Sequence, residues 1–302
     1  MPEPSSDILT SMSYDISFYK RKEATLSKGE VFTYLEEKGL KKNGPESRSY
    51  HYENERTGVY FIMDDAAMLK EEDEAQILEN IQEFDSLNLT LLLNNLRPDF
   101  FGKETSLFVD DFVKTFDLYI YPDDGDGLIF KPEVNEIYER WSKMNKNYAS
   151  IPDISKELSF YPLEKSNKLW EYAFNAGVMQ EELGEGCYVP NIFYLKNKKT
   201  GEVAVACTWT EHIPTVMPEV DYVLLNQAVK GFFSTSYKQG FVSYDTLMDN
   251  FGSYFKEHKN GTKIINEDQS AKIGNIFNTL PLDLSSEDFE GIGLESIKNY
   301  KE

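Results

Sequence analysis

The run Leu87–Asn94 (LNLTLLLN) constrains the fold of this chain more than any other stretch of its sequence. It is almost continuously apolar, and it ends between an asparagine and Pro98. Eight residues give too few turns for a buried helix, whereas a strand covered by other elements commonly has this length and pattern. The sequence therefore predicts a short central strand around which a sheet is built.

The elements predicted around this strand are mixed in order. Residues 13–19 alternate like a strand, and two hairpins at 49–63 and 191–210 turn through the shared pattern Asn-x-basic-Thr-Gly. Both turns need a left-handed glycine, which explains their likeness without a duplication. Helical periodicity or capping signals predict helices after Ser27, at 104–116, from Pro132, at 169–184, at 243–255 and at 273–280.

The order of these elements lacks the strand–helix–strand alternation of a parallel sheet. It predicts an α+β fold with two α/β-containing domains, whose mixed or antiparallel sheets are flanked by helices. The length of 302 residues suits two domains. A stretch rich in Asn, Ser, Pro and Lys at 145–165 marks the boundary. The predicted domains are 13–147 and 148–302, after a disordered leader at 1–12.

The charge of the chain bears on its partners. It carries 52 acidic and 31 basic residues, a net charge of −21, and the acidic excess is present in both halves. Such a field disfavours nucleic acid and anionic membranes and attracts basic proteins, although solubility alone is the competing interpretation. No apolar run is long enough to span a membrane, and no secretory signal begins the chain. Two cysteines without metal spacing favour a reducing cytoplasm.

Residues 121–133 (YPDDGDGLIFKPE) resemble the calcium loop of an EF-hand. Aligned from Pro122, the matching positions hold Asp124, Asp126, Gly127 and Glu133. The first ligand is a proline, however, and the preceding residues 117–121 alternate like a strand where an EF-hand needs a helix. The sequence favours an acidic strand-to-helix turn and leaves open a weaker cation site at Asp123, Asp124 and Asp126. It predicts no other cofactor than this calcium.

Two loops gather aromatic and charged residues outside the periodic elements. In the first, Trp209, Glu211 and His212 follow a predicted strand and precede a proline. Glu211 and His212 are adjacent, so on an extended strand they point to opposite faces and form no dyad without a bulge. In the second, Arg97 leaves the central strand, where it could hold a carboxylate or pair with Asp99. We predict Arg97, Trp209, Glu211 and His212 as binding residues, as contact residues concentrate in such loops.

Several hydrophobic and turn-forming motifs from Ser13 onward resemble a set of uncharacterised bacterial proteins. These motifs are Met12-Ser13-Tyr14-Asp15-Ile16, Thr57-Gly58-Val59-Tyr60-Phe61, Leu96-Arg97-Pro98-x-Phe100-Phe101 and Pro214-x-x-x-Pro218-Glu219-x-Asp221-Tyr222. Small acidic cytoplasmic proteins of that sort are similar to immunity proteins, which shield a bacterium from secreted toxins. The resemblance implies a protein partner but no catalytic residue.

The sequence contains no assembled catalytic set, so the leading hypothesis is a non-enzymatic acidic binding protein. Its specific form is a bacterial immunity protein that neutralises a basic toxin. The alternative is a metal-dependent hydrolase whose site lies near Trp209–His212 or Asp123–Asp126.

Overall fold

The computed structural model describes residues 12–44, 46–230 and 235–301. Local signals set the start of its helix α2 (Lys28–Glu37). The hydroxyl of Ser27 accepts a hydrogen bond from the amide of Glu30, and the Glu30 carboxylate accepts one from the amide of Ser27. This is the predicted capping box. Most of the leader predicted at 1–12 lies outside the described residues.

Both predicted hairpins are present and antiparallel: β3 with β4 (Ser49–Glu53 and Tyr60–Asp64), and β8 with β9 (Ile192–Asn197 and Val203–Trp209). The two turns have the same construction. The side-chain oxygens of Asn54 and Asn197 each accept hydrogen bonds from the amides two and three residues later. Gly58 and Gly201 have left-handed backbones, with φ of 72° and 75°. The prediction that these turns need a left-handed glycine is confirmed.

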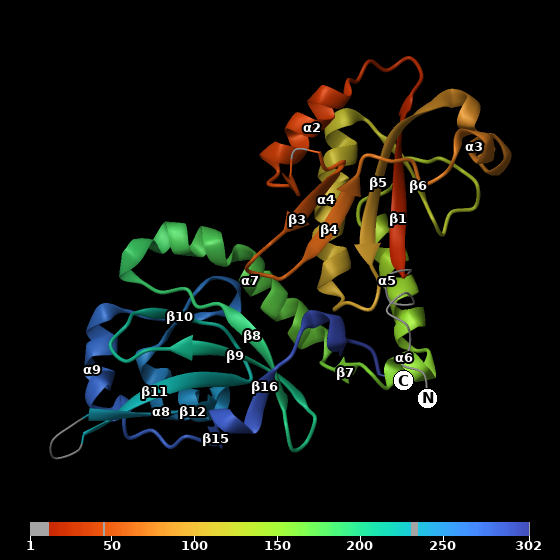
Figure 1. Ribbon diagram of the computed structural model, residues 1–302. Coiled ribbons are helices and arrows are strands. Elements are labelled where there is room, and N and C mark those ends of the chain that lie inside the picture. Colours follow the sequence, from red (N-terminus) through yellow and green to blue (C-terminus); the bar gives the residue numbers. More distant parts are fainter. Residues whose placement is uncertain (1–11, 45, 231–234, 302) are drawn as a thin grey trace. The chain divides into compact units, whose positions relative to one another are not determined.

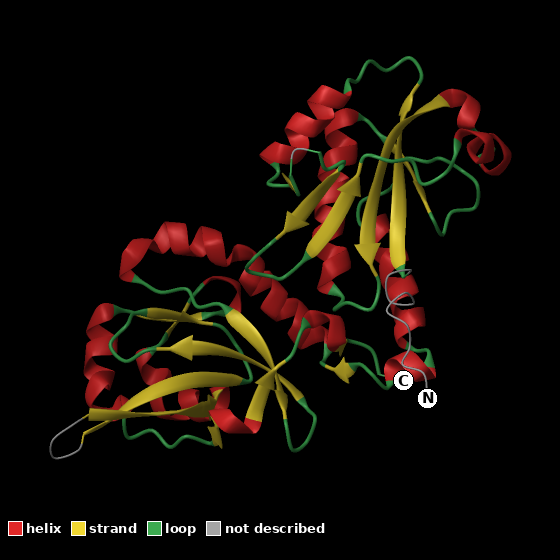
Figure 2. Cartoon of the chain, in the orientation of Figure 1, coloured by secondary structure: helices red, strands yellow, loops and turns green. Residues whose placement is uncertain are grey.

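The chain divides into an N-terminal unit, up to Lys156, and a C-terminal unit, Glu157–Lys301, which are described separately. Each unit contains a six-stranded sheet with helices packed beside it (Figures 1 and 2). The predicted α+β class is therefore confirmed. No helix of the described ranges combines the length and the apolar character needed to cross a membrane.

The sheet of the N-terminal unit is antiparallel throughout, in the order β2-β3-β4-β5-β1-β6. The predicted central strand is β5, between β4 and β1, and it is longer than predicted. The other bounds are β1 (Ser13–Arg21), β2 (Lys41–Lys42), α3 (Glu71–Ile77), η1 (Ile81–Glu83), β5 (Phe84–Asn94), α4 (Phe100–Phe116), β6 (Tyr119–Pro122), α5 (Glu136–Ala149) and α6 (Pro152–Ser155).

Aromatic side chains join helix α4 to its neighbours. Phe112 of α4 meets Phe18 of β1 edge to face, with ring centroids 5.0 Å apart. Trp141 of α5 is fully buried and lies directly over Gly102 of α4, where a Cβ atom would come within 2.2 Å of the indole. Gly102 thus allows α4 and α5 to approach closely, because any larger residue would displace Trp141.

The predicted start of helix α5 at Pro132 is wrong. The helix begins at Glu136, after Asn135 turns the chain with a left-handed backbone (φ 66°). Val134, two residues after Pro132, is 75% exposed and lies before the helix. The periodic pattern did not reveal Asn135, one of the few residue types that adopt this backbone readily.

The sheet of the C-terminal unit is mixed, in the order β15-β12-β11-β9-β8-β16. Strands β9 and β11 pair in parallel, and the other neighbours are antiparallel. Strand β9 alternates as a strand buried on both faces should. Val205, Cys207 and Trp209 belong to one hydrophobic cluster, whereas Ala204 and Ala206 belong to another.

Further elements complete this unit. Small strands form a second sheet, in the order β10-β14-β13, and a parallel pair, β17 with β7. The bounds are β7 (Ser159–Phe160), α7 (Leu163–Leu183), η2 (Gly184–Gly186), β10 (Thr215–Met217), β11 (Tyr222–Lys230), β12 (Thr235–Ser243), α8 (Tyr244–Phe251), η3 (Gly252–Tyr254), β13 (Lys256–Glu257), η4 (Lys259–Gly261), β14 (Lys263–Ile265), α9 (Glu267–Phe277), β15 (Leu284–Ser285), η5 (Ser286–Asp288), β16 (Phe289–Gly291), η6 (Leu294–Ser296) and β17 (Ile297–Lys298).

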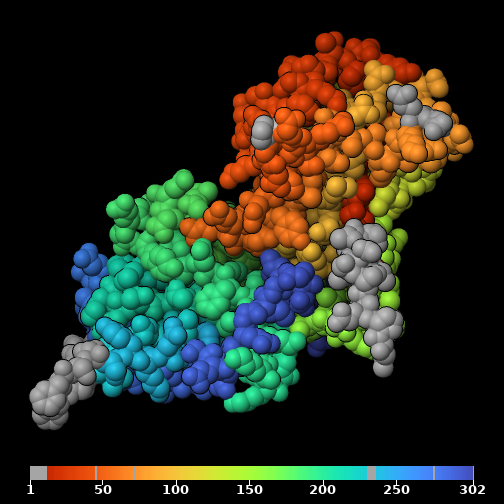
Figure 3. Space-filling view, in the orientation of Figure 1, coloured from red at the N-terminus to blue at the C-terminus, as the bar shows by residue number. Residues whose placement is uncertain are grey.

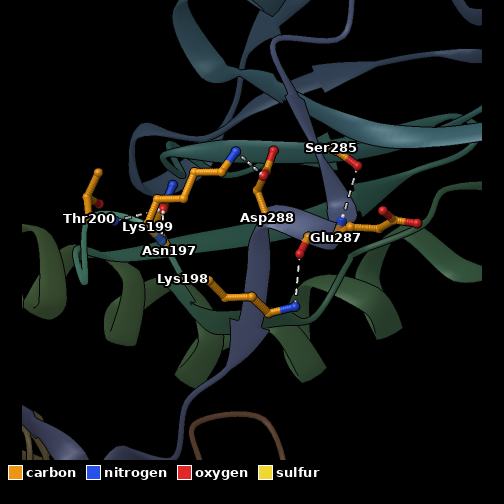
Figure 4. A network of polar contacts seen from close by, with 7 residues as sticks. All are labelled: Asn197, Lys198, Lys199, Thr200, Ser285, Glu287 and Asp288. Atoms are coloured by element: carbon orange, nitrogen blue, oxygen red, sulfur yellow. Dashed lines mark hydrogen bonds and ion pairs between the residues drawn. The ribbon is translucent and has the colours of Figure 1, made fainter.

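The C-terminal segment covers both edges of this sheet, because β15 pairs with β12 and β16 pairs with β8. It lies along the surface as the dark blue band in Figure 3. The turn of the second hairpin holds it in place (Figure 4). Lys199 donates to the Asp288 carboxylate over 2.6 Å, and Lys198 donates to the carbonyl oxygen of Glu287 over 2.9 Å. The segment thereby shields edges that would otherwise invite another strand.

Candidate functional site

The parallel pairing of β9 with β11 places Asp221 in a fixed position, immediately before β11 begins. The amide of Asp221 donates to the carbonyl oxygen of Val205, and the amide of Val205 donates back to Oδ2 of the Asp221 side chain, both over 2.9 Å. The amide of Tyr244, at the start of α8, donates to the Asp221 carbonyl oxygen. Asp221 is therefore held by its backbone and by its side chain.

Two further side chains donate hydrogen bonds to the Asp221 carboxylate. One lies just before helix α7 and the other in its first turn. The hydroxyl of Tyr161 donates to Oδ2 over 2.8 Å, and the ammonium of Lys165 donates to Oδ1 over 2.6 Å. Tyr161 is 2% exposed. Burial, and next the charge of Asp221, raises the pKa of Tyr161, so the phenol stays protonated and acts as a donor.

These contacts lie at a pocket of about 350 Å³, here called the Asp221 pocket. Its lining residues come from α7, from the segment before β11 and from the start of α8: Glu164, Lys165, Lys168, Glu219, Val220, Asp221, Ser243, Tyr244 and Asp245. The volume lies near the lower end of the range of about 300–1,000 Å³ for ligand pockets. It is large enough for a single side chain.

The Asp221 pocket has an acidic excess. Within the described ranges, Glu164, Glu219 and Asp245 form no ion pair, and all three are exposed. Burial, followed by the negative charges of Glu219 and other nearby carboxylates, raises the pKa of Tyr244 to about 12. The field at the pocket therefore attracts cations.

A second pocket, of about 440 Å³, lies between α4 and the segment before α5. Two of its charged groups already have partners. Asp111 accepts a hydrogen bond from Tyr34 and pairs with Lys38, and Lys131 pairs with Asp117. This pocket offers a ligand less uncompensated charge than the Asp221 pocket does.

The calcium-like loop is tied to its own unit. The carbonyl oxygen of Gly127 accepts a hydrogen bond from the amide of Glu79, and the side chain of Asn80 forms two hydrogen bonds with the backbone of Ile129. Gly127 has a φ of 87°, and a Cβ atom there would lie 2.7 Å from the carbonyl oxygen of Ile77. Gly127 and Ile129 thus serve packing, and strand β6 precedes the loop as predicted.

The acids of this loop do not converge on one point. Asp124 accepts a hydrogen bond from Tyr14 over 3.1 Å and lies 3.6 Å from Arg140. In the part of the chain that the structure describes, no group of three or more His, Cys, Asp or Glu side chains could hold a metal ion. The residues Asp123, Asp124 and Asp126 therefore provide no preformed calcium site.

Asp123 faces a like charge from the neighbouring strand. Its amide donates to the carbonyl oxygen of Asp15, so the two residues lie side by side at the ends of β6 and β1. Burial and the charge of Asp15 raise the pKa of Asp123 to about 7. Burial also raises the pKa of Asp15, whose Oδ1 atom is buried and has no hydrogen-bond donor among the described residues.

Trp209 lies in the core, which corrects its prediction as a binding residue. It is 2% exposed, and its ring is packed edge to face against Phe251, Phe255 and Phe277. Its indole N–H donates to the carbonyl oxygen of Ile213. The residue ends strand β9 on the face that carries Val205 and Cys207, so strand alternation directs it inward.

Glu211 and His212 form the contact that strand geometry was expected to prevent. Strand β9 ends at Trp209, and His212 follows in a turn with a left-handed backbone (φ 66°), so its Nε2 lies 3.2 Å from Glu211 Oε1. Gly274 of α9 makes room for the imidazole, because a Cβ atom there would come within 1.7 Å of the ring. Asn278 donates to the other oxygen of Glu211.

Arg97 is engaged within the N-terminal unit. Its guanidinium donates to the hydroxyl of Tyr60 over 2.6 and 3.2 Å and to the carbonyl oxygen of Leu96 over 3.0 Å. Asp99 is fully buried and accepts hydrogen bonds from Tyr138 and Ser142. The guanidinium thus holds the hairpin against the turn after β5.

The sequence prediction missed the Asp221 pocket, because its parts are far apart in the chain. Tyr161 and Lys165 fall in the stretch 145–165 that was assigned to a domain boundary. One signal was available: a lysine in the first turn of a helix opposes the helix dipole, which favours an acidic partner beside Lys165. Comparisons of the chain with known protein families, curated proteins and solved structures find no match.

Proposed function

We propose that this protein binds a basic protein partner and that the Asp221 pocket receives a cationic side chain of that partner. One observation carries the proposal. Three exposed carboxylates without ion pairs among the described residues surround a pocket in which the anchored Asp221 already holds an ammonium group. The site therefore favours positive charge, and hydrogen bonds from Tyr161 and Val205 hold the Asp221 carboxylate in place before a partner arrives.

The net charge of the chain and the carboxylates of the pocket act on a partner over different distances. The net charge of −21 accelerates the encounter with a basic partner, an effect that salt screens over about 8 Å at physiological ionic strength. The pocket acts at contact distance, where a cation is partly shielded from solvent. Affinity that depends on the pocket therefore persists at salt concentrations that suppress the long-range attraction.

The specific form of the proposal is an immunity protein that neutralises a basic toxin. It is supported by the acidic charge of both halves of the chain and by the resemblance of its turn motifs to small acidic bacterial proteins. The test takes a basic reading frame that is encoded directly beside its gene, expresses it with and without this chain, and measures growth. We expect growth only when the chain is present, and growth inhibition that the chain does not relieve would contradict immunity.

The pocket itself is tested with an N-acetylated oligolysine peptide at about 0.15 M salt. The variant Glu164→Gln/Glu219→Gln/Asp245→Gln removes the three unpaired carboxylates, and we expect affinity to fall about tenfold, because each exposed charge contributes about 0.5 kcal/mol. The control Glu181→Gln/Glu185→Gln/Glu290→Gln removes the same charge from exposed sites of the same unit. Equal losses in the two variants would contradict the proposal.

A hydrolase is the second candidate function, and one observation favours it: the contact between Glu211 and His212. A carboxylate that orients an exposed imidazole is a common arrangement in general-base catalysis. His212→Asn removes the base and keeps a residue type that tolerates the left-handed backbone. Loss of turnover on a panel of esters and phosphoesters would support the hydrolase, and wild-type turnover in the variant would exclude His212 as its base.

A further inference from the structure

We infer that Lys165 occupies the position of the partner's cation, and that a lysine side chain of the partner displaces it from Asp221. The inference rests on the proposed function and specifies its ligand as a primary ammonium. The structure already contains the proposed contact, because Oδ1 of Asp221 accepts a hydrogen bond from the Lys165 ammonium over 2.6 Å at the wall of the pocket.

Lys165 is the replaceable member of this pair. Its side chain is 60% exposed, whereas that of Asp221 is 17% exposed. It also stands in the first turn of α7, where the helix dipole opposes a positive charge. A lysine at such a position releases its carboxylate at little cost, because water solvates the freed ammonium and an exposed ion pair contributes little to stability.

Asp221 is the fixed member. Oδ2 accepts hydrogen bonds from the buried Tyr161 hydroxyl and from the amide of Val205. The backbone of Asp221 is hydrogen-bonded to the backbones of Val205 and Tyr244 on neighbouring elements. The carboxylate therefore keeps its place when Lys165 leaves, and Oδ1 remains directed at the pocket.

The occupation of Oδ2 selects the incoming cation. A guanidinium binds a carboxylate best through two parallel hydrogen bonds, one to each oxygen. At Asp221 both lone-pair directions of Oδ2 are already used by Tyr161 and Val205, which leaves Oδ1 alone. An ammonium needs a single oxygen at this point, as the Lys165 ammonium shows. The site therefore favours lysine over arginine.

The test compares Lys165→Met with Lys168→Met. Both substitutions remove one positive charge from the same helix and the same pocket, and only Lys165 pairs with Asp221. We expect Lys165→Met to bind the N-acetylated oligolysine peptide about twofold to fivefold more tightly than Lys168→Met does. An oligoarginine peptide of equal length should show a smaller difference. Equal affinities of the two variants for oligolysine would overturn the proposed exchange of Lys165 for a lysine of the partner.

Asp221→Asn supplies a second measurement, since an amide oxygen still serves Tyr161 and Val205 while the charge is lost. In this background Lys165→Met should leave oligolysine affinity unchanged within about twofold, and a gain equal to that in the wild-type background would overturn the inference. If Lys165→Met and Lys168→Met behave alike while the triple glutamine variant still loses affinity, the exchange fails and the proposed function stands. If the triple glutamine variant alone leaves the affinity for oligolysine unchanged, the proposed function fails.

Discussion

The two acidic regions of this molecule hold their carboxylates in opposite ways. In the N-terminal unit, Asp123 lies beside Asp15, and burial together with this like charge raises the pKa of Asp123 to about 7. In the C-terminal unit, Asp221 receives donors from Tyr161, Val205 and Lys165. The pKa of a carboxylate is thus raised in one region, whereas in the other the carboxylate is surrounded by hydrogen-bond donors.

The difference explains why acidic sequence patterns are poor guides to cation sites. The loop at 121–133 carries the more obvious motif, but its acids diverge, and a neighbouring carboxylate helps to raise the pKa of Asp123. Asp221 stands almost alone in sequence, but the fold brings three donors to it. Fixed donors, rather than the number of acids, hold a carboxylate in the position in which it can bind a cation.

The largest expected effect is on the stability of the C-terminal unit. Asp221→Ala leaves the Tyr161 hydroxyl and the Val205 amide without their acceptor, and we expect a loss of about 3 kcal/mol. Hydrogen exchange measured by mass spectrometry reports the unfolding of each unit separately. Asp245→Ala, in the same pocket, is the control and should change stability by less than about 0.5 kcal/mol. Equal effects of the two substitutions would show that the anchoring of Asp221 is unimportant.

A smaller effect of opposite sign is expected at Asp123. Its folded-state pKa, about 7, lies above the ordinary value of 3.8, so its contribution to stability is complete below pH 3.8 and is lost as the pH rises to about 7. Asp123→Asn should therefore stabilise the N-terminal unit at pH 8 by about 1 kcal/mol, a figure reduced for the exposure of this residue.

The advantage of Asp123→Asn over the wild type should grow between pH 4 and pH 7 and then stay constant. Thermal unfolding across this range measures it. The neighbouring substitution Asp126→Asn is the control and should retain the wild-type pH dependence. If Asp123→Asn retained it as well, the account of the pair with Asp15 would be wrong.

The smallest effect is expected at Lys165. Because its ion pair with Asp221 is more than half exposed on the lysine side, Lys165→Met should change the stability of the C-terminal unit by less than about 1 kcal/mol. Urea unfolding provides the measurement. A loss as large as that of Asp221→Ala would mean that Lys165 is a structural residue, which would contradict its replacement by a ligand.

Local patterns predicted those parts of the fold that depend on neighbours in sequence. The capping box of Ser27, the two Asn-x-basic-Thr-Gly turns and the central strand follow from such signals. The start of α5 was wrong because Asn135, rather than Pro132, turns the chain into the helix. A residue that favours the start of a helix at one position does not exclude a start a few positions later.

The candidate site depended on contacts that no local pattern contains. Asp221 and Tyr161 are joined only when β9 and β11 pair in parallel and α7 begins beside them. Trp209 was taken for a surface residue because a polar loop follows it, although the alternation of β9 directs it into the core. His212 reaches Glu211 because its left-handed backbone turns the chain after β9 has ended.

The most direct test of the central claim is a titration of the ¹⁵N-labelled protein with N-acetylated oligolysine, followed by NMR. We predict that the largest amide shifts occur at Val205, Asp221 and Tyr244, whose N–H groups are hydrogen-bonded around the Asp221 carboxylate and backbone. Shifts that are largest at Asp123–Asp126, or that are spread evenly over acidic surface residues, would contradict the assignment of cation binding to the Asp221 pocket.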